Sequence, residues 1–423
     1  MRYFKFFLSA IALMACGSQV NASSYGVYDS RGLGMAGTAV AVGNINQGQF
    51  YNPSLIAFHE GDEDRTQDGI HTFSAIVNRL SDGAQTAIEV ITDDLEGRLS
   101  RAIDELNDVP TANAARNGID AARDLGKAMR KINREGIDAD GYIGYALTLP
   151  GDREGGAFFI GARLLGAGTS TIDGSDLELL DDYIEALQYV ASSGEQGSQH
   201  PELYNEENRL YDPSSRILSS AAGTGIVLSE LGVSAAKQWQ IGGIPLAVGF
   251  TPKLVQLRSY DERWRVVEGS FASNDSVRRA LYFNFDVGVT AEIANQYRVA
   301  LAIKDARRYS FSTALGREVT LRPRVRLGLA YQNNNLQLGM DVDLNENPNF
   351  HTLVQQQVIS LGVDYQLLQS LSLRLGYQHD IAEFGDNRVA AGLGWRVGRF
   401  ATEFAYSDGD TGIGAALQLS FYH

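Results

Sequence analysis

Residues 371–378 read Leu-Ser-Leu-Arg-Leu-Gly-Tyr-Gln, so that each large apolar side chain is followed by a polar or small one. The same alternation returns at 389–397, VAAGLGWRV, and at 413–421, IGAALQLSF. A period of two places the two kinds of side chain on opposite faces of a β-strand. Runs of about 10 such residues are typical of strands that cross a membrane as part of a β-barrel. We therefore predict an all-β transmembrane barrel.

Similar segments earlier in the chain bring the total to about fourteen strands, which we expect to pair in antiparallel order. They lie at about 70–79, 141–149, 156–165, 223–238, 241–258, 279–293, 297–305, 322–332, 335–344, 353–366, 371–380, 388–397, 399–407 and 412–421.

The connections between these segments alternate in length. Those at 150–155 and 294–296 are short, whereas those at 80–140 and 166–222 are long. Outer-membrane barrels have short turns on the periplasmic side and long loops outside. The rhythm of the loops therefore agrees with the period-two pattern, and an even strand count returns both chain ends to the periplasmic side.

Two of the long loops contain apolar residues spaced three or four apart, which is the period of a helix. The first pattern lies within 84–137 and the second within 175–195. We expect both to form helical caps folded over the barrel mouth. The alternatives are helices that bind a partner protein or lie on a membrane surface, although both patterns are more acidic than a lipid-binding helix.

The first 22 residues resemble a secretory signal peptide. Arg2 and Lys5 precede the apolar run 6–15, which is too short to cross a bilayer as a helix. Val-Asn-Ala at 20–22 fits a cleavage site of small residues, so we expect cleavage between Ala22 and Ser23. Lipoprotein processing at Cys16 is the alternative. Cleavage after Ala22 would remove the one cysteine, and with it any disulfide, thiolate metal site or thiol redox chemistry.

The composition of the chain argues against two classes of protein, those that bind nucleic acid and those that cross a membrane with helices. The formal net charge of −15 argues against nucleic-acid binding and is expected of a solvated surface. No segment approaches 18 consecutive apolar residues, so no transmembrane helix is expected. Export combined with barrel strands predicts the outer membrane of a Gram-negative bacterium, with membrane lipid around the barrel.

Charged residues of the strands fall on the polar phase of the alternation. They are Asp341, Asp343, Asp364, Arg374 and Arg396. An arginine facing lipid would cost about 2–4 kcal/mol at the membrane midplane, so we expect these side chains to face a wet lumen. Tyr331, Tyr365 and Tyr377 lie near strand ends on the apolar phase, where interfacial aromatic side chains are expected.

Motifs for catalysis or cofactor binding are weak. Residues 32–37 spell GxGxxG, but a dinucleotide site needs a preceding strand, a following helix and a later acidic residue. His379 and Asp380 are adjacent but no G-x-S-x-G motif accompanies them, and we expect His379 at the barrel rim. The acidic run 62–64 lacks EF-hand spacing. We predict no catalytic, cofactor or metal-binding residues and no enzyme activity.

The stretch FYNPSLIAF at 50–58 is more informative. Pro53 fixes its own φ and disfavours the helical conformation at Asn52, which predicts a turn. Together with RGLGMAGTAVA at 31–41 and the strands that follow, this stretch resembles the FadL-like fatty-acid transporter superfamily of outer-membrane barrels. In that superfamily an Asn-Pro-Ala motif lies in an N-terminal hatch that plugs the barrel, and Ser54 stands here in place of the alanine.

Within the superfamily, the glycine-rich start and the acidic helical insertion are most similar to the plasmid conjugal-transfer TraF group. A thioredoxin-like protein shares that name, but no C-x-x-C is present here. The resemblance implies a signal peptide at 1–22, a hatch at 23–66 and a barrel at 67–423. Phe50, Tyr51, Asn52 and Pro53 are the expected hatch and ligand-path residues, since an Asn-Pro turn can pack against lumen carboxylates and arginines.

The resemblance also implies what the barrel does. The leading hypothesis is passage or capture of a small hydrophobic molecule, which would leave through a gap in the wall. Pro245 and Pro252 mark a strand where such a gap is expected. The alternative is a structural component of a conjugative transfer apparatus, whose outer helices contact partner proteins. A preserved cavity favours the first hypothesis, and a lumen filled by the hatch favours the second.

Overall fold

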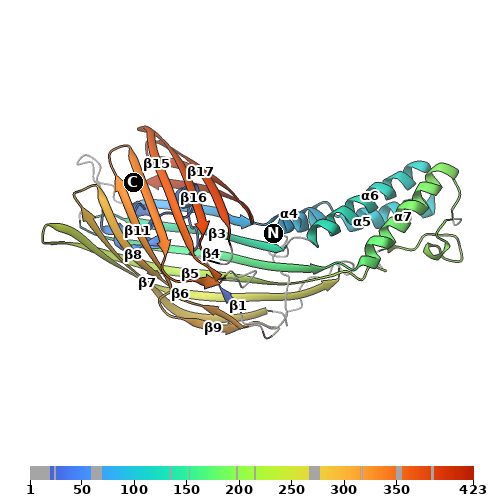
Figure 1. Cartoon of the computed structure of the whole chain (residues 1–423), viewed down its shortest axis with the longest axis horizontal. Coiled ribbons are helices and arrows are strands. Elements are labelled where there is room, and N and C mark those ends of the chain that lie inside the picture. The colour runs from blue at the N-terminus through green and yellow to red at the C-terminus, as the bar shows by residue number, and fades with distance from the viewer. Residues whose placement is uncertain are drawn as a thin grey trace.

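The chain folds as a closed β-barrel with a bundle of helices projecting from one end (Figure 1). The computed structural model describes residues 20–22, 25–58, 69–133, 136–151, 153–196, 199–213, 216–265, 277–314, 316, 318–348, 355–382 and 385–423. The predicted signal segment up to residue 19 with Cys16, the expected cleavage residue Ser23 and the acidic run 62–64 lie outside these ranges. Val20–Ala22 form the short strand β1.

Fourteen strands form the barrel wall, and each wall strand pairs antiparallel with its neighbours. They are β2 (Ile70–Leu80), β3 (Ile137–Leu149), β4 (Glu154–Thr171), β5 (Ser220–Ile241), β6 (Ile244–Arg265), β7 (Val277–Ile293), β8 (Tyr297–Lys304), β11 (Arg324–Gln332), β12 (Leu336–Asp343), β15 (Val358–Leu368), β16 (Leu371–Asp380), β17 (Asn387–Val397), β18 (Phe400–Gly409) and β19 (Gly412–Tyr422). Every predicted strand is present, and β19 pairs with β2 to close the wall.

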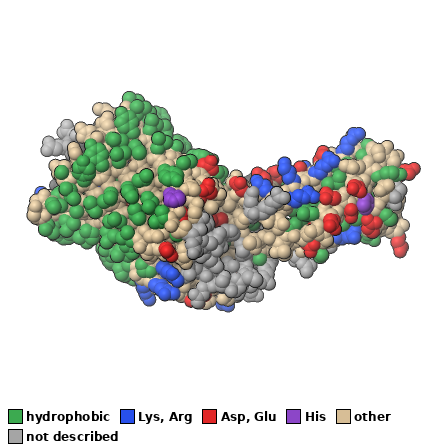
Figure 2. Space-filling model, in the orientation of Figure 1, with side chains coloured by type: hydrophobic (Ala, Val, Ile, Leu, Met, Phe, Trp, Pro, Cys, Tyr) green, Lys and Arg blue, Asp and Glu red, His purple; other side chains and the backbone are tan. Residues whose placement is uncertain are grey.

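The alternation sorts side chains between lipid and lumen as predicted. Leu375, Val389 and Phe404 are each more than half exposed on the outer face. Figure 2 shows the apolar side chains gathered over the barrel, while charged side chains gather on the projecting helices. Asp341, Asp343 and Arg374 are buried on the inner face.

Strands β4 to β7 continue beyond their predicted ends on the side of the long loops. β5 and β6 are 22 residues each, about twice the 9–11 residues that a strand needs to cross a membrane. Where neither face of a strand meets lipid, apolar and polar side chains no longer alternate. Gly166, Ala167 and Gly168 of β4, for example, are all buried. The alternating pattern therefore underestimates the length of these strands.

Short strands occupy two of the loops on this side. β9 (Tyr309–Ser312) and β10 (Glu318–Leu321) form a hairpin between β8 and β11, and β1 pairs in parallel with β10. β13 (Asn347–Pro348) and β14 (Gln355–Gln356) form a second small ladder.

Four helices occupy the two long loops after β2 and β4, as predicted. They are α4 (Asp82–Thr92), α5 (Leu95–Asp108), α6 (Ala112–Ile132) and α7 (Gly174–Ser193). Ser81 and Thr111 cap α4 and α6, because each side chain accepts a hydrogen bond from a backbone N–H of the first turn. Among the residues that the structure describes, no helix combines the length and apolarity that crossing a bilayer needs.

The prediction that these helices fold over the barrel mouth is wrong. Figure 1 shows α5, α6 and α7 pointing away from the barrel. Their apolar stripes pack against one another through Leu106, Leu125 and Leu187, which are almost fully buried in one shared core. The stripes are therefore used within the bundle and leave no apolar face to cover the barrel. We call residues 82–133 and 172–213 the arm.

Candidate functional site

Residues 25–58 form the hatch, and they lie inside the barrel. The hatch contains α2 (Ser30–Gly34), η1 (Ile45–Gln47), α3 (Gly48–Tyr51) and η2 (Pro53–Ala57). All its residues are buried except Asn44 and Ile45. α2 contacts β2 and β16 to β19, whereas η2 contacts β4 to β7, so the hatch reaches from one side of the lumen to the other.

Asn52 holds the hatch turn through four hydrogen bonds. Its Nδ2 donates to the Val40 carbonyl at 2.8 Å and to Thr290 Oγ1 at 3.0 Å. Its Oδ1 accepts from the backbone N–H of Ser54 at 3.1 Å and from the Ser54 hydroxyl at 2.6 Å. Asn52 is thus the N-cap of η2, with Pro53 at the first helical position.

The turn packs against glycines of the wall, and not against lumen carboxylates and arginines as we expected. A Cβ atom at Gly249 of β6 would overlap the Pro53 backbone, and one at Gly288 of β7 would overlap the Asn52 side chain. The neighbouring polar partner is the Thr290 hydroxyl. Close approach of two backbones at this point excludes the longer charged side chains.

Phe50 and Tyr51 form the aromatic part of the hatch. Phe50 stacks on Tyr28 with ring centroids 6.0 Å apart and meets the Tyr142 ring of the wall edge-on at 5.8 Å. The Tyr51 hydroxyl accepts from the Tyr28 N–H at 2.9 Å and donates to Asp29 Oδ1 at 3.1 Å. These contacts fix α3 against the residues that precede α2 and against β3.

The GxGxxG stretch has a structural role. Its first half lies within α2, where Gly34 lies close to Gly392 of β17, with an added Cβ 3.1 Å from the Gly392 Cα. His379 lies at the end of β16, where its Nδ1 is 2.7 Å from Asn387 Oδ1. The neighbouring Asp380 points to the other face of the strand and is buried.

Carboxylates and arginines of the wall hold the α2 side of the hatch. Arg31 of the hatch pairs with Asp364 of β15 at 2.8 Å, and Arg374 pairs with the same carboxylate at 3.1 Å. Asp341 of β12 accepts from the N–H groups of Ala39 and Val40 at 2.8 and 2.9 Å. Two of the predicted lumen-facing charges, Asp341 and Asp364, therefore bind the hatch, through Ala39, Val40 and Arg31 and not through the Asn-Pro turn itself.

A second group of charged side chains lies beside the hatch, and the sequence pattern did not predict it. Lys253 of β6 is 3.1 Å from Asp286, 2.7 Å from Asp305 and 3.5 Å from Glu230. Lys304 pairs with Asp286 at 3.3 Å and donates to the Phe50 carbonyl. The inward phase of β6 and β7 could have placed Lys253 and Asp286 in the lumen, but it could not have shown that the strand register brings them within 3.1 Å of each other.

Beyond this charged group, towards the arm, the inner face of the wall becomes apolar. We call this region the outer lumen patch, and its wall members are all buried. They are Leu165, Ala167, Ile226, Leu228, Val255, Leu257 and Tyr282. The hairpin β9–β10 covers the patch with Val319 and Leu321, and the Tyr309 ring stacks on Tyr282 at 3.9 Å.

Two cavities flank the hatch, and both are polar. One of about 250 Å³ lies at the end with short turns, and it is lined by Arg31, Asp364, Arg374, Arg396 and Glu403 among others. The other, of about 30 Å³, lies between Tyr25 of the hatch and wall residues that include Arg79, Arg326 and Arg388.

The wall is closed at the two prolines for which a gap was expected. Pro245 pairs with Gln240 beside the turn between β5 and β6. At Pro252 the ladder between these strands skips two residue pairs and resumes in the same register. A hydrogen bond of 2.8 Å between the Ser234 and Thr251 hydroxyls spans the interruption.

Residues 49–343, more than half of the chain, match the family described as F plasmid transfer operon, TraF, protein. The chain belongs to this TraF family. No curated protein sequence matches it.

Solved structures similar to this TraF-family chain are barrels. The CymD monoaromatic hydrocarbon channel has a TM-score of 0.50 at 9% identity, with 95% of this chain and 99% of that chain covered. A Pseudomonas aeruginosa FadL homologue has a TM-score of 0.49 at 10% identity over 96% and 99%. The Ralstonia pickettii toluene transporter TbuX has 0.48 at 10% over 94% and 98%. At these identities the likeness to the CymD channel shows the fold alone, a closed β-barrel.

Proposed function

We propose that this TraF-family barrel captures a small hydrophobic molecule from outside a Gram-negative bacterium, and that the hatch controls its further passage. The observation that carries this proposal is the outer lumen patch. A water-filled barrel interior is normally polar, so a buried apolar surface of seven wall residues there needs an apolar partner. The β9–β10 hairpin now supplies that partner.

The order of features along the lumen fits such a path. A molecule that displaced the hairpin would lie on Val255 and Leu257, two and four positions along β6 from Lys253. The charged group around Lys253 and the Asn52 turn lie next, and both would oppose the passage of an apolar molecule straight through the lumen. The wall is closed at Pro252, but its ladder is interrupted there, next to Lys253, and we propose that the wall opens at this point as a lateral exit.

Toluene-like compounds are suitable probes, because similar barrels are described as a monoaromatic hydrocarbon channel and a toluene transporter. Photoaffinity labelling with a diazirine-bearing aromatic hydrocarbon, mapped by mass spectrometry, tests capture. We expect labels on the wall residues of the outer lumen patch. Leu228→Asn should reduce this labelling severalfold, because it places a polar side chain in the patch.

Leu231→Asn is the matched control, since Leu231 lies on the same strand but is 42% exposed on the lipid face. Labelling restricted to lipid-facing residues, or equal labelling of the Leu228→Asn and Leu231→Asn variants, would reject the capture site.

Two other observations favour a second function, contact with a partner protein of a conjugative apparatus, and the first is that the hatch reaches across the lumen. The second is that the arm projects from the barrel (Figure 1), and its acidic residues outnumber its basic ones by more than two to one. Replacing both arm insertions with short loops should lower plasmid transfer frequency and leave hydrocarbon labelling unchanged. Unchanged transfer frequency would reject this role for the arm.

A further inference from the structure

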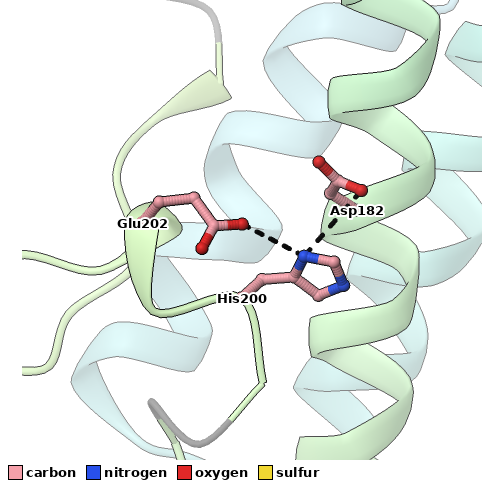
Figure 3. Close-up of side chains that lie close together, drawn as sticks. All are labelled: Asp182, His200 and Glu202. Atoms are coloured by element: carbon pink, nitrogen blue, oxygen red, sulfur yellow. Dashed lines mark hydrogen bonds and ion pairs between the residues drawn. The ribbon is translucent and has the colours of Figure 1, made fainter.

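One histidine and three carboxylates converge on the arm, at the point where η3 (Pro201–Leu203) lies beside α7 (Figure 3). His200 Nδ1 is 3.1 Å from Glu202 Oε1 and 3.8 Å from Asp182 Oδ1. On the other side of the ring, Nε2 is 3.1 Å from Glu185 Oε2. Asp182 and Glu185 lie one turn apart on α7, so they face His200 together.

The charges of this group are unbalanced. Within the part of the chain that the structure describes, Asp182, Glu185 and Glu202 have no ion pair with a lysine or arginine, and each is paired with His200 instead. By contrast, the adjacent Asp181 pairs with Arg130 at 3.1 Å. Three carboxylates around one imidazole leave a negative excess that a divalent cation would offset.

The donor atoms also have the spacing of a metal site. One atom each from Asp182, His200 and Glu202 lie within 4.8 Å of one another. A tetrahedral Zn²⁺ with bonds of about 2.0–2.2 Å holds its ligand atoms roughly 3.4 Å apart. The observed 3.1 and 3.8 Å on either side of Nδ1 bracket that spacing.

We propose that Asp182, His200 and Glu202 bind a divalent transition-metal ion, with Zn²⁺ as the best fit. One imidazole nitrogen with carboxylate oxygens suits Zn²⁺ better than Mg²⁺ or Ca²⁺, which prefer oxygen ligands alone. Glu185 is a positioning residue, because it accepts a hydrogen bond from Nε2–H and thereby directs Nδ1 to the ion. A fourth coordination position is left for water.

Bound metal would join two segments of the arm. Asp182 belongs to α7, whereas His200 and Glu202 belong to the segment 199–213. That segment also contributes Leu203 and Leu210 to the arm core. A metal ion would therefore fix the segment to α7 and make it more resistant to proteases.

Tag-free protein titrated with Co²⁺ and then Zn²⁺ tests the site. We expect a visible Co²⁺ absorption band of low-symmetry coordination, saturating at one equivalent and abolished by Zn²⁺. His200→Ala, Asp182→Asn and Glu202→Gln should each weaken Zn²⁺ binding at least tenfold. Glu185→Gln should weaken affinity by about 10–100-fold while the stoichiometry stays at one.

Two variants are matched controls. Asp181→Asn removes the neighbouring carboxylate of α7, and His379→Ala removes a histidine that lies at the barrel rim. Both should bind Zn²⁺ as the unmodified chain does. Zn²⁺ should also slow protease cleavage within 199–213 in the unmodified chain and not in His200→Ala.

The proposal is overturned if His200→Ala binds as tightly as the two controls, or if one equivalent of Co²⁺ produces no ligand-field band. In that case the imidazole only bridges the carboxylates by hydrogen bonds. These side chains are partly exposed, so the substitutions are not expected to prevent folding of the arm, and the helical circular dichroism signal of each variant verifies this.

Discussion

Two glycines of the wall determine how closely the hatch turn can approach it. Gly288→Ala would force a methyl group into the Asn52 side chain, which is held by four hydrogen bonds. Overpacking of this kind costs about 1–3 kcal/mol, and we expect it to displace the turn and open the lumen. Ion conductance in planar bilayers should rise.

Gly156→Ala is the control for this experiment, because a Cβ there meets only the Ser234 carbonyl at 3.4 Å. Equal conductance of the Gly156→Ala and Gly288→Ala variants would contradict the role given to Gly288.

For single residues, the sequence predicted local backbone conformation and the face of a strand better than it predicted contacts. Asn-Pro chemistry is local, so the turn at Asn52 could be read from 50–54 alone. Its partner Thr290 lies 238 positions away, and no local pattern points to it. The same holds for Lys253 and Asp286. The alternation along β6 and β7 shows that both side chains face the lumen, but the register that brings them together exists only in the assembled wall.

The arm should unfold without the barrel, because it has a hydrophobic core of its own. Leu106 is fully buried in that core, and Leu106→Ala is expected to cost the arm about 2–5 kcal/mol. Limited proteolysis should then cleave the arm faster, while the barrel stays heat-modifiable on gels. Val109→Ala, at a residue 61% exposed, is the control. Loss of the folded barrel in Leu106→Ala would show that the two parts are not independent.

Stability of the arm should also depend on pH through Glu96 of α5. Burial, and then the charges of Asp212 and Asp94, raise the pKa of Glu96 from 4.5 to about 6. The folded arm therefore holds a proton that the unfolded arm releases between about pH 4.5 and 6, so its stability falls as the pH rises through that window.

Glu96→Gln removes the free-energy cost of ionising this half-buried carboxyl group in the folded arm. We expect the arm to gain on the order of 1 kcal/mol above pH 6, after allowance for solvent screening, and nothing at pH 4. Thermal melts of the helical circular dichroism signal at both pH values measure the gain, with Glu105→Gln on the same helix as control. A gain at pH 4 equal to that at pH 7 would contradict the explanation.

The spacing of apolar residues predicted the helices and strands, but it did not predict that the arm points away from the barrel. The period identifies an apolar stripe and does not say what covers it. In this chain Leu187 of α7 lies against Gly118 of α6, so two insertions separated by β3 and β4 cover each other. Pairing between separate insertions leaves no trace in the local pattern of either one.

The whole barrel depends on a continuous apolar band facing lipid. Leu375 of β16 is 63% exposed on that face. Leu375→Arg is expected to destabilise the barrel by about 2–4 kcal/mol at the membrane midplane, measured as a lower urea midpoint of unfolding from lipid vesicles. Leu375→Ala, which keeps an apolar surface, should have a smaller effect. Similar midpoints for both variants would argue against lipid at this position.

The position of the hatch sets an order of events during biogenesis. Hatch residues precede every wall strand in the chain, yet they contact opposite sides of the lumen, at Thr290 of β7 and near Gly392 of β17. The wall itself becomes continuous only when β19, the last strand, pairs with β2. A segment that spans the lumen in this way has to be enclosed while the seam is open. Pairing of β19 with β2 therefore encloses the hatch, and we expect a chain that forms this pair with residues 25–58 still outside to mature as an empty pore.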